Sequence, residues 1–198
     1  MIQSTPAVLP TQVQTARLVL RAYQVTDAAW YYSMSLRNQD HLAHYEASNP
    51  VRSIHAILDA EAVMRSFVTE WEAHRSFFFA VFVQATGEFA GQIHLGEVNP
   101  DVLEYEVGYF AETDHQGKGY IHEAVMGVLS FTFEYLGAQR VRLECDDTNI
   151  PSWRVAEHCG FKKEGHIRQN KRQSDGTLSG TLFYGMLRHE FFQPVKEG

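Results

Sequence analysis

The sequence predicts a mixed α/β domain with a central, mostly antiparallel sheet of about seven strands, flanked by about four helices. Three observations support this prediction. Short apolar or alternating segments, which are typical of strands, recur along the chain. Longer segments with apolar residues at helical spacing separate several of them. The two kinds follow one another in the order βααβββαβαββ, which favours one sheet with helices packed on its faces.

The N-terminal part is predicted to form one strand and two helices. Residues 17–21 alternate between apolar and polar side chains and predict the first strand. Thr26, followed by an aspartate, offers an N-cap for a helix that we expect to run to about Arg37. Residues 38–50 are expected to be irregular. A second helix is predicted at residues 57–73, because apolar side chains recur there at helical spacing.

The middle of the chain is rich in predicted strands. Apolar segments at residues 77–84, 89–97 and 103–110 predict three of them, separated by turn sequences at 85–88 and 99–101. Because these turns are short, we expect the three strands to pair as an antiparallel meander.

The C-terminal part alternates again between helices and strands. A loop at residues 114–119 precedes a long helix that is expected to end near Leu136. The remaining predicted elements are, in order, a strand at 140–145, a short helix at 152–158, and two strands at 161–171 and 178–187 around a turn at Ser174–Gly176.

The length and composition are those of one globular domain. The chain has 198 residues with 44% hydrophobic content, enough to bury a full core. We expect a single domain at residues 15–192, with residues 1–14 as a loosely ordered extension and residues 193–198 as a tail. The two cysteines, Cys145 and Cys159, match no zinc spacing and are expected to be reduced thiols.

The charge and the chain ends narrow the range of partners. A formal net charge of −7 argues against general nucleic-acid binding, which needs a basic face, and suits cationic partners such as amines. The N-terminus lacks a cationic segment followed by an apolar run, and no stretch reaches the roughly 20 apolar residues that span a bilayer. We therefore expect a cytoplasmic protein without a membrane or nucleic-acid partner.

The segment Gln116–Tyr120 lies between a predicted strand and a long helix. The first turn of a helix presents unpaired N–H groups and the positive end of its dipole, which suit a phosphate. Gly117 and Gly119 allow close approach of the backbone, and Lys118 adds a charge that can reach a phosphate. The segment also fits an ordinary helix-entry turn. Neither a nucleotide P-loop nor a dinucleotide-binding fingerprint matches it.

The wider context of this segment resembles a known family. Gln116-x-x-Gly119-x-Ile121 is similar to the Gln/Arg-x-x-Gly-x-Gly/Ala signature of the GNAT N-acetyltransferases. Residues 106–109 resemble the fourth strand of that family, and Asn149-x-x-Ser152, followed by Gly-Phe at 160–161, resembles its Asn-x-x-Ser segment.

Both ends of the chain resemble one branch of that family. Thr15–Arg21 and Tyr184–Arg188 are similar to segments of the RimJ/RimL type, which acetylates ribosomal-protein N-termini. The resemblance spans roughly Thr15 to Phe191. It implies the GNAT fold, acetyl-CoA as co-substrate, no metal, and direct transfer of acetyl to a primary amine in a ternary complex.

The resemblance leaves the acceptor open. It is either a protein N-terminal α-amine or a small amine, and a homodimer is compatible with the family. An alternative from another class is a catalytically silent acyl-CoA-binding sensor or interaction module. An acyl-enzyme on Cys159 is disfavoured, because direct transfer suits the family.

The resemblance also implies a set of cofactor-binding residues. The strand that ends at Tyr109–Ala111 is expected to splay from its neighbour and to pair its backbone with the pantetheine arm. Amides from Gly117 to Ile121 are expected to hold the pyrophosphate, and Asn149 and Ser152 to contact the pantetheine or thiol end. The full set is Tyr109, Phe110, Ala111, Gln116, Gly117, Lys118, Gly119, Tyr120, Ile121, Asn149 and Ser152.

The catalytic candidates follow partly from the family. Glu106 is the candidate base, because family members place a carboxylate on this strand that acts through water. Glu104 has the same parity, and two adjacent carboxylates would raise one pKa; Glu144 is a further candidate. The short helix lacks the tyrosine that many members use as general acid, so Ser152 and Tyr184 are the candidates for that role.

Two departures from the family pattern affect the expectations. Ile121 stands where the signature has Gly or Ala, so we expect tighter packing without loss of binding. The last hairpin lacks the Trp and Asp that the branch often carries. Side chains expected to line the acceptor pocket are His41, His44, Tyr45, Trp71 and Tyr184. His41-x-x-His44 has a metal-like spacing, but no third ligand is near in sequence and no metal is expected.

Overall fold

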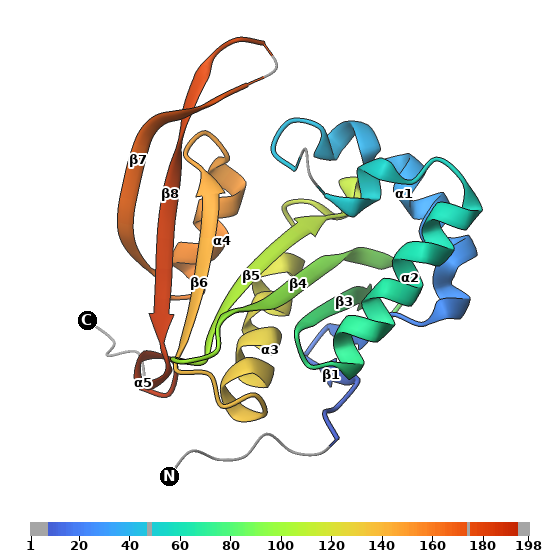
Figure 1. The fold of residues 1–198 in the computed structure, drawn as a ribbon, viewed down its shortest axis with the longest axis horizontal. Helices are drawn as coiled ribbons and strands as arrows, with labels where there is room; N and C mark the ends of the chain where they lie inside the picture. The colour runs from blue at the N-terminus through green and yellow to red at the C-terminus, as the bar shows by residue number, and fades with distance from the viewer. Residues whose placement is uncertain (1–7, 47–48, 174, 194–198) are drawn as a thin grey trace.

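The computed structural model describes residues 8–46, 49–173 and 175–193. Its centre is a sheet of eight strands in the order β1-β2-β3-β4-β5-β6-β8-β7 (Figure 1). The strands are β1 Gln12–Gln14, β2 Leu18–Ala22, β3 Ser76–Val83, β4 Phe89–Asn99, β5 Glu104–Ala111, β6 Arg140–Asp146, β7 Lys162–Arg172 and β8 Leu178–Leu187. The helices are α1 Ala28–Leu42, α2 Ile57–Glu72, α3 Tyr120–Glu134, α4 Ile150–His158 and α5 Arg188–Phe191, with 3₁₀ turns η1 Val25–Asp27, η2 Pro50–Ser53 and η3 Thr113–His115.

This architecture confirms the predicted mixed α/β fold. All neighbouring strands pair antiparallel except β5 and β6. The predicted meander is present as β3, β4 and β5. The eighth strand, β1, pairs with β2 and lies before residue 15, where the sequence prediction placed the start of the domain. Residues 1–7, the turn residue Ser174 and residues 194–198 of the predicted tail lie outside the described residues.

Two hydrophobic clusters hold helices against opposite faces of the sheet (Figure 1). The larger cluster packs α3 and α4 on one face, and its centre is a group of edge-to-face aromatic contacts around Phe131, which meets Phe77 and Phe79. The smaller cluster packs α1 and α2 on the other face, through fully buried Tyr31 and Met64. Burial of such large side chains is the main stabilising contribution to the sheet–helix layers.

The first helix is longer than predicted. Residues 38–42 were expected to be irregular, but α1 continues to Leu42. Asparagine is a poor helix former, yet the side chain of Asn38 is fully buried and donates to the carboxylate of Glu112 and, at 3.0 Å, to the carbonyl of Met34. Leu42 is also buried. These tertiary contacts extend the helix beyond its local preference.

The sheet opens between β5 and β6. Their parallel ladder contains only three residue pairs and ends at Glu106 and Arg142. Beyond this point β5 continues to pair with β4 alone, while β6 pairs with β8. The two strands therefore diverge toward their carboxyl ends, as Figure 1 shows, and this divergence is called the splay below.

The hairpin of β7 and β8 forms one end of the sheet. β7 is the edge strand, and its residues are exposed except for half-buried Gly165. A Cβ at Gly185 would lie 2.5 Å from both Arg140 Nη1 and Glu164 Oε1, so a glycine is needed where this ion pair crosses β8. Among the described residues, no helix has the length and apolar character needed to cross a membrane.

Candidate active site

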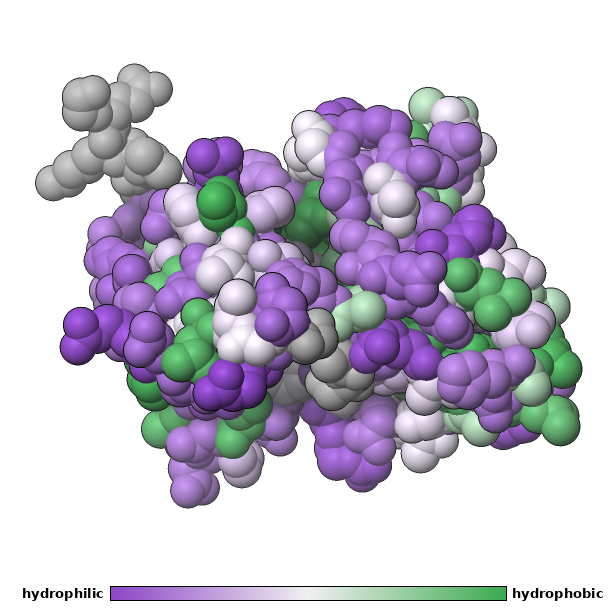
Figure 2. Space-filling model, turned by 90° about the horizontal axis from the view of Figure 1, so that it is seen from above, coloured by the Kyte–Doolittle hydropathy of each residue, from purple (hydrophilic) through white to green (hydrophobic). Residues whose placement is uncertain are grey.

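A small cavity of about 90 Å³ lies in the splay. Figure 2, seen from above this end of the molecule, shows the surface hollowed between the β7–β8 side and the α1–α2 side. The cavity is lined by residues of β5, β6, β7, the start of α4 and the segment after α1: Tyr45, Glu46, Val107, Gly108, Tyr109, Leu143, Glu144, Cys145, Asp146, Asn149, Ser152 and Lys171. Side chains far apart in the sequence therefore converge where the sheet opens.

The edge of β5 that faces the splay is free of a strand partner. Residues 107–111 pair with β4 on one side, whereas the ladder to β6 has already ended at Glu106. Backbone N–H and C=O groups need partners when they are buried, so this edge can accept an extended ligand as an added strand. The predicted segment Tyr109–Ala111 forms the last part of this edge.

The loop before α3 presents backbone amides to solvent. Gly117 and Gly119 have φ angles of 71° and 74°, the left-handed region that favours glycine. Gly119 is the N-cap of α3, and no side chain caps the helix. A Cβ at Gly117 would meet no atom within 4 Å, so the space in front of the loop is open. Uncapped amides at a helix N-terminus are suited to an anion.

Arg17 and Glu123 shape this loop, a role that the sequence did not reveal. Arg17 donates from Nε to Glu123 at 2.6 Å and from Nη1 to the carbonyl of Lys118 at 3.1 Å. Its guanidinium also lies 4.9 Å from the ring centre of Tyr120. Glu123 accepts a further hydrogen bond from Thr15 at 2.6 Å. The turn between β1 and β2 thus holds the first turn of α3.

The loop also contacts α1. The side-chain amide of Gln116 lies 3.1 Å from Nε2 of His41. Glu112, which is buried at the end of β5, accepts from Asn38 and lies 3.3 Å from Nε of Arg37. α1, on the opposite face of the sheet, therefore contacts the predicted phosphate loop at Gln116 and the chain just before the loop at Glu112.

Ile121 fits the structure because of a glycine on β4. Ile121 is buried, and its Cδ1 lies 2.7 Å from the position that a Cβ of Gly91 would occupy. Glycine at position 91 thus provides the room that the larger side chain needs. This is the tighter packing expected from the sequence.

Asn149 and Ser152 lie at the start of α4, beside the splay. The side chain of Asn149 caps the helix and accepts from the amide of Ser152 at 3.3 Å. The hydroxyl of Tyr109 crosses from β5 and donates to the carbonyl of Ser152 at 2.7 Å. The hydroxyl of Ser152 is 3.4 Å from that of Tyr109. The structure thus brings these three predicted residues together.

The carboxylates of β5 are each paired with an arginine of β6. Glu106 accepts from Arg142 at 2.8 Å, and Glu104 accepts from Arg140 at the same distance. The two acids therefore do not form the coupled carboxylate pair that the sequence suggested. Glu144 lies 3.9 Å from Arg142 and lines the cavity.

Glu46 is a cavity-lining acid that the sequence did not single out. It follows α1, and it faces the splay together with Tyr45 and Lys171. Burial raises the pKa of Glu46, while hydrogen bonding to Asn49 and the charge of Lys171 lower it in part. Its sequence context, between a tyrosine and an alanine, carries no recognisable signal.

Tyr184 lies in a second, larger cavity between α4 and the β7–β8 hairpin. It is buried, and its hydroxyl donates to Glu157 at 3.1 Å. Burial, and then the hydrogen bond to Glu157, raise its pKa. Of the three predicted catalytic residues, only Ser152 lines the cavity in the splay; neither Tyr184 nor Glu106 is among its lining residues.

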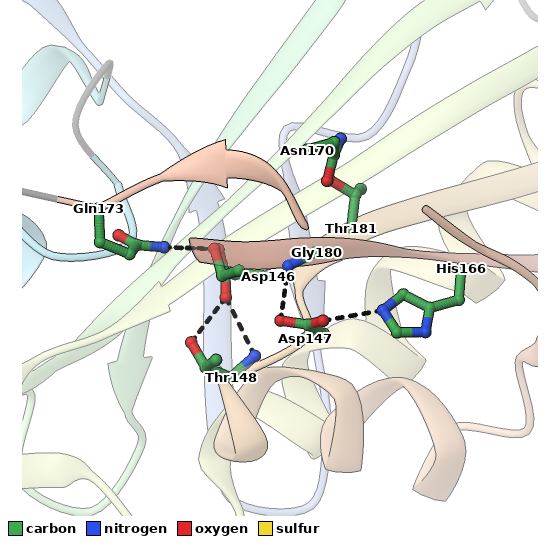
Figure 3. Close-up of polar contacts among 9 residues, drawn as sticks. Asp146, Asp147, Thr148, His166, Asn170, Gln173, Gly180 and Thr181 are labelled. Carbon is green, nitrogen blue, oxygen red and sulfur yellow. Dashed lines mark hydrogen bonds and ion pairs between the residues drawn. The ribbon is translucent and has the colours of Figure 1, made fainter. Parts of the chain in front are cut away.

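Figure 3 shows how polar contacts fix the hairpin beside the splay. Asp146 accepts from the side chains of Gln173 at 2.8 Å and Thr148 at 2.6 Å. Asp147 accepts from the amide of Gly180 at 2.8 Å and lies 2.8 Å from Nε2 of His166. These contacts join the end of β6 to both strands of the hairpin.

The expected acceptor-pocket residues divide into two groups. Tyr45 lines the cavity and donates to the carbonyl of Thr148 at 3.1 Å, and the ring of His44 lies 4.3 Å from its own. Trp71 instead packs in the core against Phe77 and Phe79, so its expected place in the pocket wall is wrong. Its helical spacing did not distinguish a core side chain from a pocket wall.

The two thiols are free and buried. Burial raises the pKa of Cys145 to about 11 and that of Cys159 to about 12. Such thiols are poor nucleophiles. Within the described ranges, no group of three or more His, Cys, Asp or Glu side chains is arranged to hold a metal ion.

Comparison with known proteins agrees with this geometry. The sequence model of the acetyltransferase (GNAT) domain matches residues 17–162. The SPbeta prophage-derived uncharacterized N-acetyltransferase YokL of Bacillus subtilis (strain 168) is 30% identical over 179 residues, which are 88% of this chain and 92% of that protein.

Two solved structures share the fold. Mycobacterium smegmatis RimJ in complex with CoA-disulfide has a TM-score of 0.80 at 24% identity, covering 93% of this chain and 90% of that chain. RimL, the ribosomal L7/L12 alpha-N-protein acetyltransferase in complex with coenzyme A, has a TM-score of 0.78 at 17% identity, covering 90% and 97%. With a family match that spans most of its length, this chain belongs to the GNAT acetyltransferases.

Proposed function

We propose that this acetyltransferase transfers the acetyl group of acetyl-CoA to the α-amine of a protein N-terminus. As a family member the chain is an acetyl-CoA-dependent N-acetyltransferase. The observation that supports the proposal best is the splay, which has a free strand edge beside its cavity, at the end of the molecule that Figure 2 shows hollowed. An acceptor that is part of a longer chain needs such an opening, because the chain must leave the site.

The residues present fit acetyl-CoA. The uncapped amides from Gly117 to Ile121 would bind the pyrophosphate, with the loop held in shape by Arg17. The free edge of β5 at residues 107–111 would pair with the amide groups of the pantetheine arm. A backbone N–H of this edge would also polarise the thioester carbonyl. The reacting carbon would then lie in the splay, near Ser152.

Relatives point to two kinds of acceptor. RimL and a Vibrio fischeri structure described as ribosomal-protein-S5-alanine acetyltransferase are named for protein substrates. A relative 25% identical over 152 residues is the spermidine N(1)-acetyltransferase of Vibrio cholerae. The divergence of β5 and β6 favours the first kind, since it leaves room for the chain that continues beyond the amine.

The amine must lose a proton before it attacks the thioester. We assign the general base to Glu46, because it lines the splay cavity and burial raises its pKa toward the working range. Glu106, the candidate from the sequence, is paired with Arg142 and is not among the residues that line the cavity. Glu106 acting through water remains the rival assignment.

Substitution of the two carboxylates separates these assignments. Glu46→Gln should lower kcat about 100-fold, because general-base catalysis contributes factors of this size, and should remove the acid limb of the pH–rate profile. That limb reflects a base that gains activity as pH rises through its pKa. Glu106→Gln should change kcat only a few-fold. Glu164→Gln is the matched control, since Glu164 also pairs with an arginine on this sheet face.

The acceptor class is tested with defined substrates. The protein is incubated with acetyl-CoA and with peptides that carry a free N-terminus, the same peptides with a blocked N-terminus, and spermidine, and the products are identified by mass spectrometry. Acetylation of free N-termini only is expected. Acetylation of spermidine but of no peptide would show that the acceptor is a small amine. Tight binding of acetyl-CoA without any product would identify a silent sensor.

A further inference from the structure

Acetyl transfer needs a group that protonates the leaving sulfur of coenzyme A. α4, which runs from Ile150 to His158, contains no tyrosine. Tyr184 donates its hydroxyl to Glu157 in the other cavity. A proton donor for the sulfur must instead reach the splay from a neighbouring element.

Tyr109 reaches this position from β5. It lies on the strand edge that β6 leaves free, and its ring packs against the cluster beneath α3 and α4. Its hydroxyl spans the splay to the first turn of α4, where it donates to the carbonyl of Ser152 at 2.7 Å. Tyr109, Ser152 and Cys145 all line the small cavity. The phenol is therefore fixed at both ends, by its strand and by the helix.

We propose that Tyr109 is the general acid that protonates the sulfur of coenzyme A as the thioester breaks. This inference rests on the proposed acetyl transfer. The amine nitrogen forms a bond to the acetyl carbon, the carbon–sulfur bond breaks, and its electron pair goes to sulfur. The phenolic proton of Tyr109, which is donated to the carbonyl of Ser152 in the free protein, turns to that sulfur and passes to it. The phenolate recovers a proton from water through the hydroxyl of Ser152, which lies 3.4 Å away.

The surroundings of Tyr109 keep this proton in place until it is needed. Burial raises the pKa of Tyr109 well above its ordinary value, and the hydrogen bond with Ser152 offsets this only in part. The phenol therefore stays protonated over the working pH range. Because a phenolate is costly at this buried position, the proton passes as negative charge develops on sulfur, not before.

Ser152 is less suited to the same role. An aliphatic hydroxyl is a much weaker acid than a phenol, whose ordinary pKa is near 10. The amide of Ser152 is engaged by the cap of Asn149, which fixes the position of the residue. Ser152 therefore acts as a positioning residue that orients the phenol and returns its proton.

The first test removes the hydroxyl alone. Tyr109→Phe should lower kcat by about 100-fold or more, while KM for acetyl-CoA changes less than about twofold. Tyr105→Phe is the matched control: Tyr105 lies on the same strand with the same parity, is buried, and is outside the cavity. It should retain the wild-type kcat. An unchanged kcat in Tyr109→Phe, or a large loss in Ser152→Ala without one in Tyr109→Phe, overturns the proposal.

The second test needs no acceptor. Coenzyme A is bound to the protein, and its thiolate is titrated by ultraviolet absorbance. Loss of a hydrogen-bond donor to sulfur should raise the pKa of the bound thiol in Tyr109→Phe but not in Tyr105→Phe. An equal thiol pKa in wild type and Tyr109→Phe overturns the proposal. If wild type acetylates nothing, the proposed function fails, while this titration still decides the place of Tyr109.

A third measurement avoids any loss of packing. Incorporation of a difluorotyrosine at position 109 keeps the ring and hydroxyl but makes the phenol more acidic. Because burial keeps the pKa of this phenol well above the working range, Tyr109 and its fluorinated form are both protonated there. The difluorotyrosine protein should therefore keep a kcat at least equal to that of wild type, since a more acidic phenol gives up its proton more readily. A kcat as low as that of Tyr109→Phe would contradict the assignment.

Discussion

Gly119 combines two requirements at one position. It adopts a φ of 74° and it is the N-cap of α3, where the amides face open space. An alanine there would cost about 1–2 kcal/mol in the left-handed region, and its Cβ would lie 3.5 Å from Nη2 of Arg17, the side chain that holds the loop. We predict that Gly119→Ala weakens coenzyme A binding at least about tenfold, measured by titration calorimetry.

Gly87 provides the matched control for this substitution. It has a φ of 72° in the turn between β3 and β4, and a Cβ there would meet no atom within 4 Å. Gly87→Ala carries the same backbone strain but should leave the dissociation constant for coenzyme A unchanged. An equal loss of affinity in both variants would mean that strain, not access to the amides, limits binding.

Local sequence predicted part of the site and missed the rest for a clear reason. The glycine loop could be located because φ preference and helix entry are local properties. Arg17 could not be linked to Lys118 from sequence alone, since the two are 101 residues apart and meet only after the sheet forms. The hydroxyl of Tyr109 meets Ser152 across 43 residues in the same way.

The contact between β4 and α3 depends on Gly91 and Ile121. A Cβ at position 91 would collide with the carbonyl of Phe110 and lie 2.7 Å from Ile121 Cδ1. Gly91→Ala should destabilise the fold by about 1–3 kcal/mol through overpacking, and Ile121→Ala by about 2–5 kcal/mol through a cavity. In the double variant the alanine at position 121 relieves part of the clash. The double variant should therefore be destabilised by about 1 kcal/mol less than the sum of the two single variants.

Urea denaturation of the four proteins of this cycle measures the coupling. Gly91→Ala combined with Val128→Ala serves as the control pair, because Val128 is buried on the same helix but is not among the atoms nearest to position 91. Its two effects should add within about 0.5 kcal/mol. Strict additivity in the Gly91 and Ile121 pair would show that the isoleucine does not depend on the glycine.

At the scale of elements, sequence patterns located the long elements better than their ends. The strands of the meander are long and rich in apolar residues, and they were predicted correctly. β1 has three residues, QVQ, which are too few for an alternating pattern to be recognised, and it forms because β2 offers an edge. The last turn of α1 depends on the buried contact between Asn38 and Glu112, which no local pattern contains.

Across the whole molecule, Asp146 connects the end of β6 to the β7–β8 hairpin. Its carboxylate accepts from Ser179 at 2.6 Å and from Gln173 at 2.8 Å. Burial alone would raise the pKa of Asp146, but the hydrogen bonds from Ser179 and Thr148, together with the charge of Lys171, outweigh it and lower the pKa. Asp146→Asn keeps the shape but replaces one acceptor by a donor. We predict a loss of about 1–3 kcal/mol of unfolding free energy at pH 7.

The pH dependence of this loss has a definite sign. A carboxyl whose pKa is lower in the folded state stabilises the protein above the unfolded pKa, which is about 3.9, and this contribution disappears as pH falls through the folded pKa. The difference between wild type and Asp146→Asn should therefore be constant above about pH 5 and shrink below it. Urea unfolding at several pH values tests this, with exposed Asp101→Asn as the control.

The position of the hairpin is a property of the whole chain. Its strands were predicted from their own sequence, but their place beside β6 depends on Asp146 and Asp147, which are 33 residues from their partners Ser179 and Gly180. The loop and the strand of the site could therefore be predicted from the sequence. The cavity between β5, β6 and the hairpin could not.

The buried thiols have a practical consequence for following this enzyme. With a pKa of about 11, only about one in a thousand molecules carries a Cys145 thiolate at pH 8, and Cys159 ionises still less. A colorimetric disulfide reagent reacts with thiolates. It would therefore measure the coenzyme A released at each turnover, with little reaction from the cysteines of the folded protein. Any unfolding during the assay would show itself as an extra burst of colour from the enzyme's own cysteines.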